Sequence, residues 1–172
     1  MNKSSAKIIF QSVIFFLLQV VIFRNVALFD VGFCFIYIAI ILLLPIELDR
    51  IIVLIIAFAL GIMVDVFYNS FGIHASTAVI FAFLRYYWAN TMTPQGGYDS
   101  NISPNISTLG IQWFSTFTIP LLFIHHFALF YIEAGGFSFF WFTLFKVIIS
   151  TFFTFLVILL FQLLFANKKR RV

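Results

Sequence analysis

The stretch from Phe58 to Ser76, FALGIMVDVFYNSFGIHAS, places an aspartate within a run of apolar residues that could form a membrane-spanning helix. Asp65 has Gly61 one helical turn before it and Asn69 one turn after it. A carboxylate in the centre of a bilayer costs about 2.5–3.5 kcal/mol even on insertion-based scales. We therefore expect Asp65 to face protein near the membrane edge, beside the turn that starts the next helix.

The whole chain has the composition of a polytopic membrane protein. Of its 172 residues, 63% are hydrophobic and 9% are charged. Soluble domains average about 45–50% apolar residues and about 25% charged residues. The longest polar stretch, at 90–107, is too short for a separate aqueous domain. The composition predicts one integral membrane domain over residues 1–172, with any enzymatic site confined to the helices.

Six segments are apolar enough to cross about 30 Å of hydrocarbon, which predicts an all-α bundle of six transmembrane helices. They are residues 8–23, 33–44, 51–67, 73–89, 109–131 and 138–165. The second is short and ends at Pro45, so a re-entrant segment is the alternative. Two lysines precede the first segment, as in a signal peptide, but no small-residue cleavage site follows it. We therefore expect it to be an uncleaved span.

The basic residues predict the orientation of the bundle. Lys3 and Lys7 precede the first span, and four basic residues at 168–171 follow the sixth. Because positive charges stay in the cytoplasm, both termini are expected inside and Arg24 is then the one cation in an outer loop. Four crossings are the alternative. The basic tail has no interleaved aromatic residues, so no nucleic-acid partner is expected.

Helical spacing gathers polar residues on one face of each of the last four spans, and these faces should contact protein. The faces are Gly61, Asp65 and Asn69; His74, Phe81 and Arg85; Gln112, Ser115, Thr116, His126 and Glu133; and Thr143, Lys146, Ser150 and Thr154. Two readings stay open, a polar cavity or partner groove and hydrogen bonds that fix the bundle. Lys146 could snorkel outward or pair with Asp65 or Glu133.

The motifs of catalysis and metal binding are missing from the sequence. His125 and His126 are adjacent, so on a helix they point about 100° apart and chelate one ion poorly. Cys34 is the single cysteine, which excludes an intrachain disulfide and a CxxC site. A phosphate loop, a nucleophile elbow and paired carboxylates are also missing. We expect no enzyme, no metal and no cofactor.

The stretch GIMVDVFYNSFGIHAS resembles the signature of the MreD family, the small integral membrane subunit of the bacterial rod-shape and cell-elongation machinery. That signature has a glycine, an aspartate four residues later and a Gly-apolar-His/Arg-Ala turn. The matching positions are Gly61, Asp65, Gly72, Ile73, His74 and Ala75. The resemblance continues at Gln19, Asn25, Pro45, Gly96-Gly97-Tyr98, the residues 125–133 and Ser150.

The resemblance implies a non-enzymatic role in cell shape and peptidoglycan synthesis, in the bacterial inner membrane. The implied partners are MreC, a RodA-type glycosyltransferase, a class B penicillin-binding transpeptidase, membrane lipids and, indirectly, the MreB filament. The implied fold is similar to the substrate-binding subunits of energy-coupling-factor vitamin transporters. A vitamin-capturing subunit is therefore the alternative function.

The predicted outer loops favour contact with protein or lipid over capture of a polar vitamin. The loop YNSFG after the third span is short, and the loop EAGGFSFFW after the fifth is mostly aromatic. A proton-coupled channel is a third reading, but the sequence reveals no continuous relay for it.

Ten residues are the candidates for structural or interaction roles. They are Gly61, Asp65, Asn69, Gly72, His74, Arg85, His126, Glu133, Lys146 and Ser150. We expect the Asp65 carboxylate to hydrogen-bond the turn at 69–72, where Gly72 permits an unusual backbone angle, and to favour the positive end of the fourth helix. The alternative is that its charge pairs with His74, Lys146 or a partner's cation.

Overall fold

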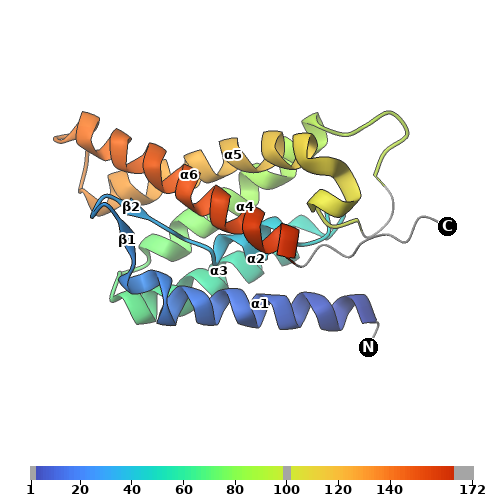
Figure 1. Ribbon diagram of the computed structural model, residues 1–172, viewed down its shortest axis with the longest axis horizontal. Coiled ribbons are helices and arrows are strands. Elements are labelled where there is room, and N and C mark those ends of the chain that lie inside the picture. The colour runs from blue at the N-terminus through green and yellow to red at the C-terminus, as the bar shows by residue number, and fades with distance from the viewer. Residues whose placement is uncertain (1–2, 99–101, 165–172) are drawn as a thin grey trace.

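The computed structural model describes residues 3–98 and 102–164, with side chains from residue 8 onward, and it is an all-α membrane protein (Figure 1). Its elements are α1 (Lys3–Val21), the 3-10 turn η1 (Phe23–Asn25), β1 (Ala27–Leu28), β2 (Gly32–Phe33), α2 (Ile38–Leu42), α3 (Arg50–Tyr68), α4 (Ile73–Thr91), α5 (Ile106–Glu133) and α6 (Phe140–Leu164). The basic run at 168–171 lies outside the described residues.

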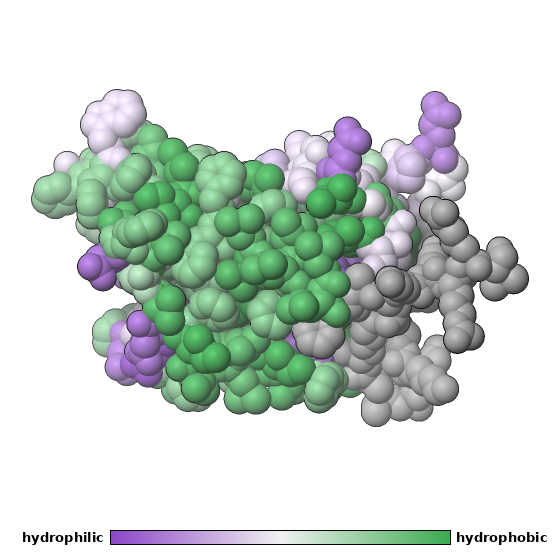
Figure 2. All heavy atoms as spheres, viewed as in Figure 1, coloured by the Kyte–Doolittle hydropathy of each residue, from purple (hydrophilic) through white to green (hydrophobic). Residues whose placement is uncertain are grey.

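Four helices are long and apolar enough to cross a membrane: α1 with the residues just after it, α3, α5 and α6. The helix α4 is 19 residues long, as α3 is, but it buries His74 and Arg85 and packs against both α3 and α5. Figure 2 shows a broad apolar surface over the middle of the bundle, with hydrophilic residues toward its two ends. The chain is thus a multi-pass helical membrane protein.

The bundle has two distinct ends. The helix α1 begins and α6 ends at one of them (Figure 1). The other end, here called the hairpin end, carries the β1–β2 hairpin, the α3–α4 turn and the α5–α6 loop. In the hairpin, Ala27 pairs with Phe33 and Leu28 pairs with Gly32, antiparallel. The charge pattern predicts that the hairpin end faces outward, and this orientation stays a prediction.

The predicted second span, 33–44, is not a membrane-length helix. Its chain leaves β2, passes through irregular residues Cys34 and Phe35, and enters α2, which has five residues. Every residue from Cys34 to Leu42 is buried. Because the segment is covered on all sides, its continuous apolar composition carries no periodicity from which a helix could be distinguished. Long helices lie at the other five predicted spans.

This buried segment still connects the two ends of the bundle. Phe33 belongs to the hairpin, whereas the backbone N–H of Ile46 donates to the carbonyl of Ile102, in the connection between α4 and α5. Irregular backbone at membrane depth is tolerated only where protein covers it and satisfies its polar groups. The interior of the bundle is therefore organised around a segment that cannot face lipid.

The helix α5 differs from its predicted face. Gly110 (φ 82°, ψ 162°) interrupts it after its first turn, and Pro120 lies inside it. Bulky side chains such as Phe114 and Phe117 fill the interior. Two members of the predicted polar face, Gln112 and Thr116, are exposed, so the prediction that they are covered by protein is wrong; Glu133 is exposed as well but pairs with Lys146. His126 is fully buried, as the prediction requires.

Candidate functional site

The turn between α3 and α4 is organised by the Asp65 carboxylate. Its Oδ1 accepts hydrogen bonds from the Ser70 hydroxyl (2.6 Å) and the His74 backbone N–H (3.0 Å), and its Oδ2 accepts one from the Ala75 N–H (2.9 Å). The first N–H groups of a helix have no partner within it. Asp65 therefore caps α4 from the preceding helix, and it pairs with no cationic side chain of the described chain. The sequence predicts hydrogen bonds to the turn at 69–72; Ser70 lies in that turn, whereas the other two donors are among the first N–H groups of α4.

Two glycines shape the same turn. A Cβ on Gly61 would lie 2.3 Å from the Ala75 Cα and 2.8 Å from the His74 carbonyl oxygen, so α3 and α4 contact each other backbone to backbone there. Gly72 has φ 82°, which suits glycine, and Asn69 ends α3 in the left-handed conformation at φ 53°. These residues, from Gly61 to His74, form one unit that we call the α3–α4 corner.

Side chains from α1 and α6 satisfy the irregular backbone of the buried segment. Ser150 accepts from the Phe33 N–H (2.9 Å) and Thr154 accepts from the Phe35 N–H (3.1 Å). Gln19 accepts from the Tyr37 N–H (3.2 Å) and donates to the Cys34 carbonyl (3.2 Å), as a side-chain substitute for a neighbouring strand. We call Gln19, Ser150 and Thr154 the polar clamp.

His126 supports the clamp from α5. Its Nε2 lies 3.1 Å from the Thr154 hydroxyl, and its Nδ1 lies 2.6 Å from the Leu122 carbonyl oxygen. The carbonyl can only accept, so Nδ1 carries the proton and Nε2 accepts from the hydroxyl. His126 thus orients Thr154 toward the buried segment, which is a structural role.

A second buried chain of hydrogen bonds joins three elements. The Tyr37 hydroxyl lies 3.3 Å from Nδ1 of His74 and 3.0 Å from Nε2 of His125. Both imidazoles and the tyrosine are buried, and Nδ1 of His125 has no hydrogen-bond partner within the described part of the chain. This chain connects the α3–α4 corner to the middle of α5.

Arg85 closes the other end of the buried segment. Its side chain, 2% exposed, donates to the backbone carbonyls of Leu42, Leu44 and Pro45. The last carbonyls of a helix lack partners within it, so Arg85 caps α2. The sequence predicts that Arg85 lies on a protein-facing side of α4, but it does not reveal which carbonyls Arg85 binds.

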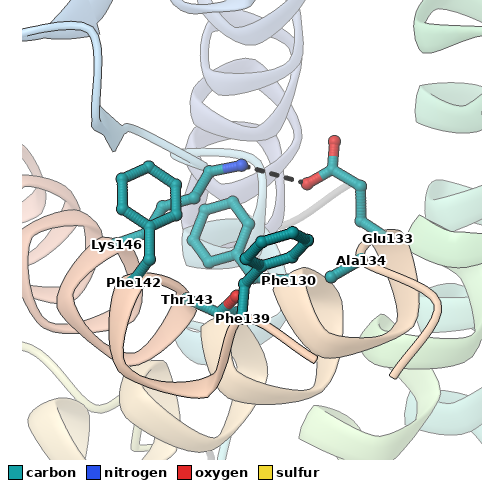
Figure 3. Close-up of a pocket in the computed structure, with 7 residues that line it drawn as sticks. All are labelled: Phe130, Glu133, Ala134, Phe139, Phe142, Thr143 and Lys146. Atoms are coloured by element: carbon teal, nitrogen blue, oxygen red, sulfur yellow. Dashed lines mark hydrogen bonds and ion pairs between the residues drawn. The ribbon is translucent and has the colours of Figure 1, made fainter. Parts of the chain in front are cut away.

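Two adjoining cavities open at the hairpin end. The first, the polar pocket, is about 240 Å³ and has Arg24, Tyr68, Ser70, His74, Glu133 and Lys146 among its lining residues. The second, the aromatic pocket, is about 430 Å³ and is lined by Phe130, Glu133, Ala134, Phe139, Phe142, Thr143 and Lys146 (Figure 3). The Lys146 ammonium and the Glu133 carboxylate, 3.2 Å apart, stand where the two cavities meet.

The structure divides the ten candidate residues among three places. The α3–α4 corner holds Gly61, Asp65, Asn69, Gly72 and His74; the pockets hold Glu133 and Lys146; and the buried segment is held by Arg85, His126 and Ser150. Their roles in interactions stay predictions. Tyr37 and Tyr68 could not be predicted from the sequence, because tyrosines are common within apolar runs.

The described residues contain no group of three or more His, Cys, Asp or Glu side chains placed to hold a metal ion. No protein-family model, no curated protein and no solved structure matches this chain.

Proposed function

We propose that this chain is a non-enzymatic membrane subunit of the bacterial rod-shape and cell-elongation machinery, which supports peptidoglycan synthesis by binding MreC and its associated synthases. The observation that carries the proposal is the α3–α4 corner. Of the residues on which the MreD resemblance rests, Gly61, Asp65, His74 and Ala75 meet through one close helix crossing and one side-chain cap, and Gly72 lies in the turn between the two helices. The stretch is therefore a coherent structural device.

The use of the interior polar groups also supports a scaffolding role. The clamp residues Ser150 and Thr154 and the buried Arg85 are bonded to backbone atoms of the segment at 33–45. Buried polar groups that are hydrogen-bonded to the backbone make the interior of a protein rigid. A rigid bundle with a fixed hairpin end is what an assembly subunit offers to its partners.

Depletion in the bacterium that encodes the chain tests this proposal. Cells should become round or swollen, and MreC should be recovered with less of the synthase pair. Complementation with Gly61→Ala, which disrupts the corner, should fail, whereas Ala59→Val, on the exposed side of the same helix, should restore rod shape. Depleted cells that keep their shape would contradict the proposal.

A second candidate function, capture of a small molecule by a transporter subunit, is favoured by one observation. The outer loops are short or aromatic, but the polar pocket behind them brings together Arg24, Tyr68 and His74. Loss of vitamin uptake on depletion, with cell shape unchanged, would support this candidate in place of the first.

A further inference from the structure

The polar pocket and the aromatic pocket lie side by side and share Phe130, Glu133 and Lys146 in their walls. Together they offer a charged end and an apolar end, as a lipid requires. We infer that they bind one anionic membrane lipid, with its phosphate in the polar pocket and an acyl chain in the aromatic pocket. The inference concerns the chain in its membrane and does not rest on the proposed function.

The charges of the polar pocket favour an anion. It is lined by two cationic side chains and one carboxylate, since Lys146 is paired with Glu133 and Arg24 forms no ion pair with a described residue. The Arg24 guanidinium stands over the Tyr68 ring, 5.9 Å from its centroid. A guanidinium presents several N–H donors in a plane that matches phosphate. Arg24 is the primary headgroup contact.

Lys146 is held in place by its surroundings. Its ammonium lies 4.8 Å from the centroid of the Phe33 ring and 4.3 Å from that of Phe130, in addition to its contact with Glu133. Cation–π contacts of this kind fix an ammonium at a protein surface. Lys146 is therefore a positioned positive charge at the junction of the pockets, with donors beyond the one used by Glu133.

His74 is a further polar residue in the lining of the polar pocket. Tyr37 has a single hydroxyl proton to share between Nδ1 of His74 and Nε2 of His125. A buried N–H without a partner is rarer than a buried acceptor without one. We therefore assign the unpaired Nδ1 of His125 as the nitrogen without a proton, so that the Nε2–H of His125 donates to the Tyr37 hydroxyl. The hydroxyl then donates to Nδ1 of His74, which leaves the proton of His74, a pocket residue, on Nε2.

The aromatic pocket identifies a lipid as the source of the anion. Its walls include Phe130, Phe139 and Phe142, and the last two are 72% and 61% exposed (Figure 3). An acyl chain would bury these exposed rings, whereas a free phosphate ion would make no contact with them. Trp141, 79% exposed beside them, is the residue type found at the headgroup level of membranes.

Native mass spectrometry of the full chain tests the site. The protein in detergent is given equal amounts of phosphatidylglycerol and phosphatidylcholine, and we expect one phosphatidylglycerol to be retained in preference. Arg24→Gln should weaken this retention about tenfold, since it removes a charged hydrogen-bond donor. Arg50→Gln is the matched control, because Arg50 is also exposed, lies 6.0 Å from the Tyr86 ring centroid, and is in neither pocket.

A second variant, Ala134→Trp, fills the aromatic pocket and leaves every charge in place. It should also reduce retention of the lipid, while inorganic phosphate alone should not bind to the wild-type chain. Circular dichroism and gel filtration establish that each variant is folded. Equal retention of both lipids, equal losses for Arg24→Gln and Arg50→Gln, or tight binding of inorganic phosphate that Ala134→Trp does not change would overturn the inference.

Discussion

The hydroxyl of Ser150, on α6, accepts a 2.9 Å hydrogen bond from the backbone N–H of Phe33, which is 117 residues earlier in the chain. One turn further along α6, Thr154 does the same for Phe35. These bonds replace the strand or helix partners that the segment lacks. The polar face of α6 thus serves the backbone of an irregular segment inside the bundle.

Replacing Ser150 with alanine should destabilise the protein by about 1–3 kcal/mol, because it leaves the part-buried Phe33 N–H without its acceptor. The neighbouring Thr151 is the matched control. Its hydroxyl is buried without a partner among the described residues, so Thr151→Val should be neutral or stabilising. Unfolding of the purified variants in detergent, followed by circular dichroism, measures both. Equal losses would show that the Ser150 hydroxyl makes no special contribution.

Variants of Asp65 should rank in the order wild type, Asn, Ala. Asparagine keeps an acceptor for Ser70 and the His74 N–H but presents its amide donors to the Ala75 N–H, whereas alanine loses all three bonds. We expect Asp65→Ala to cost about 1–3 kcal/mol in stability. Complementation of cell shape, with membrane levels measured alongside, completes the comparison. If Asn fails as badly as Ala at normal abundance, the charge itself is used.

Gly61→Ala should destabilise the α3–α4 corner by about 1–3 kcal/mol, the usual cost of overpacking. The added methyl group would meet the backbone of Ala75 and His74, which cannot move away as a side-chain tip could. Shortening the facing side chain with Ala75→Gly should therefore not rescue it. Thermal unfolding of the single and double variants gives the answer, and full rescue would show that the close contact involves only the Ala75 methyl group.

Local features of the corner could be predicted from the sequence. Asp65, Asn69 and Gly72 act on residues within ten positions of themselves, and their spacing reveals this. The buried segment could not be predicted, because its partners Gln19 and Ser150 are far away in the chain and its apolar residues fit a helix equally well. Similarly, the sequence offered Asp65 and Glu133 as partners of Lys146, and only the fold selects Glu133.

The tautomers of the buried histidines follow from the Tyr37 hydroxyl. If it donates to His74, both His74 and His125 carry their proton on Nε2. Nitrogen-15 chemical shifts of labelled histidines in the purified protein should show this state for both. In Tyr37→Phe, the His125 N–H loses its acceptor, and unfolding should cost about 1–3 kcal/mol less free energy. A proton on Nδ1 of His125 would contradict the assignment.

Arg85 should be more sensitive to conservative substitution than any exposed arginine. Its guanidinium reaches three carbonyls, of Leu42, Leu44 and Pro45, from one fixed plane, and a lysine has neither that geometry nor that reach. We expect Arg85→Lys to destabilise the protein by about 1–3 kcal/mol, since part of the cap is lost in a buried site.

Arg85→Met should cost more than Arg85→Lys, because the carbonyls of Leu42 and Leu44 then lose their side-chain donor, whereas that of Pro45 still accepts from the Leu48 N–H. Arg50→Lys is the control, since Arg50 is exposed and its guanidinium lies 6.0 Å from the centroid of the Tyr86 ring. Hydrogen exchange at the amides of 38–46 locates the effect, because loss of the cap should speed exchange there before it does in α3 or α6. Unchanged exchange in Arg85→Met would show that α2 holds its end without Arg85.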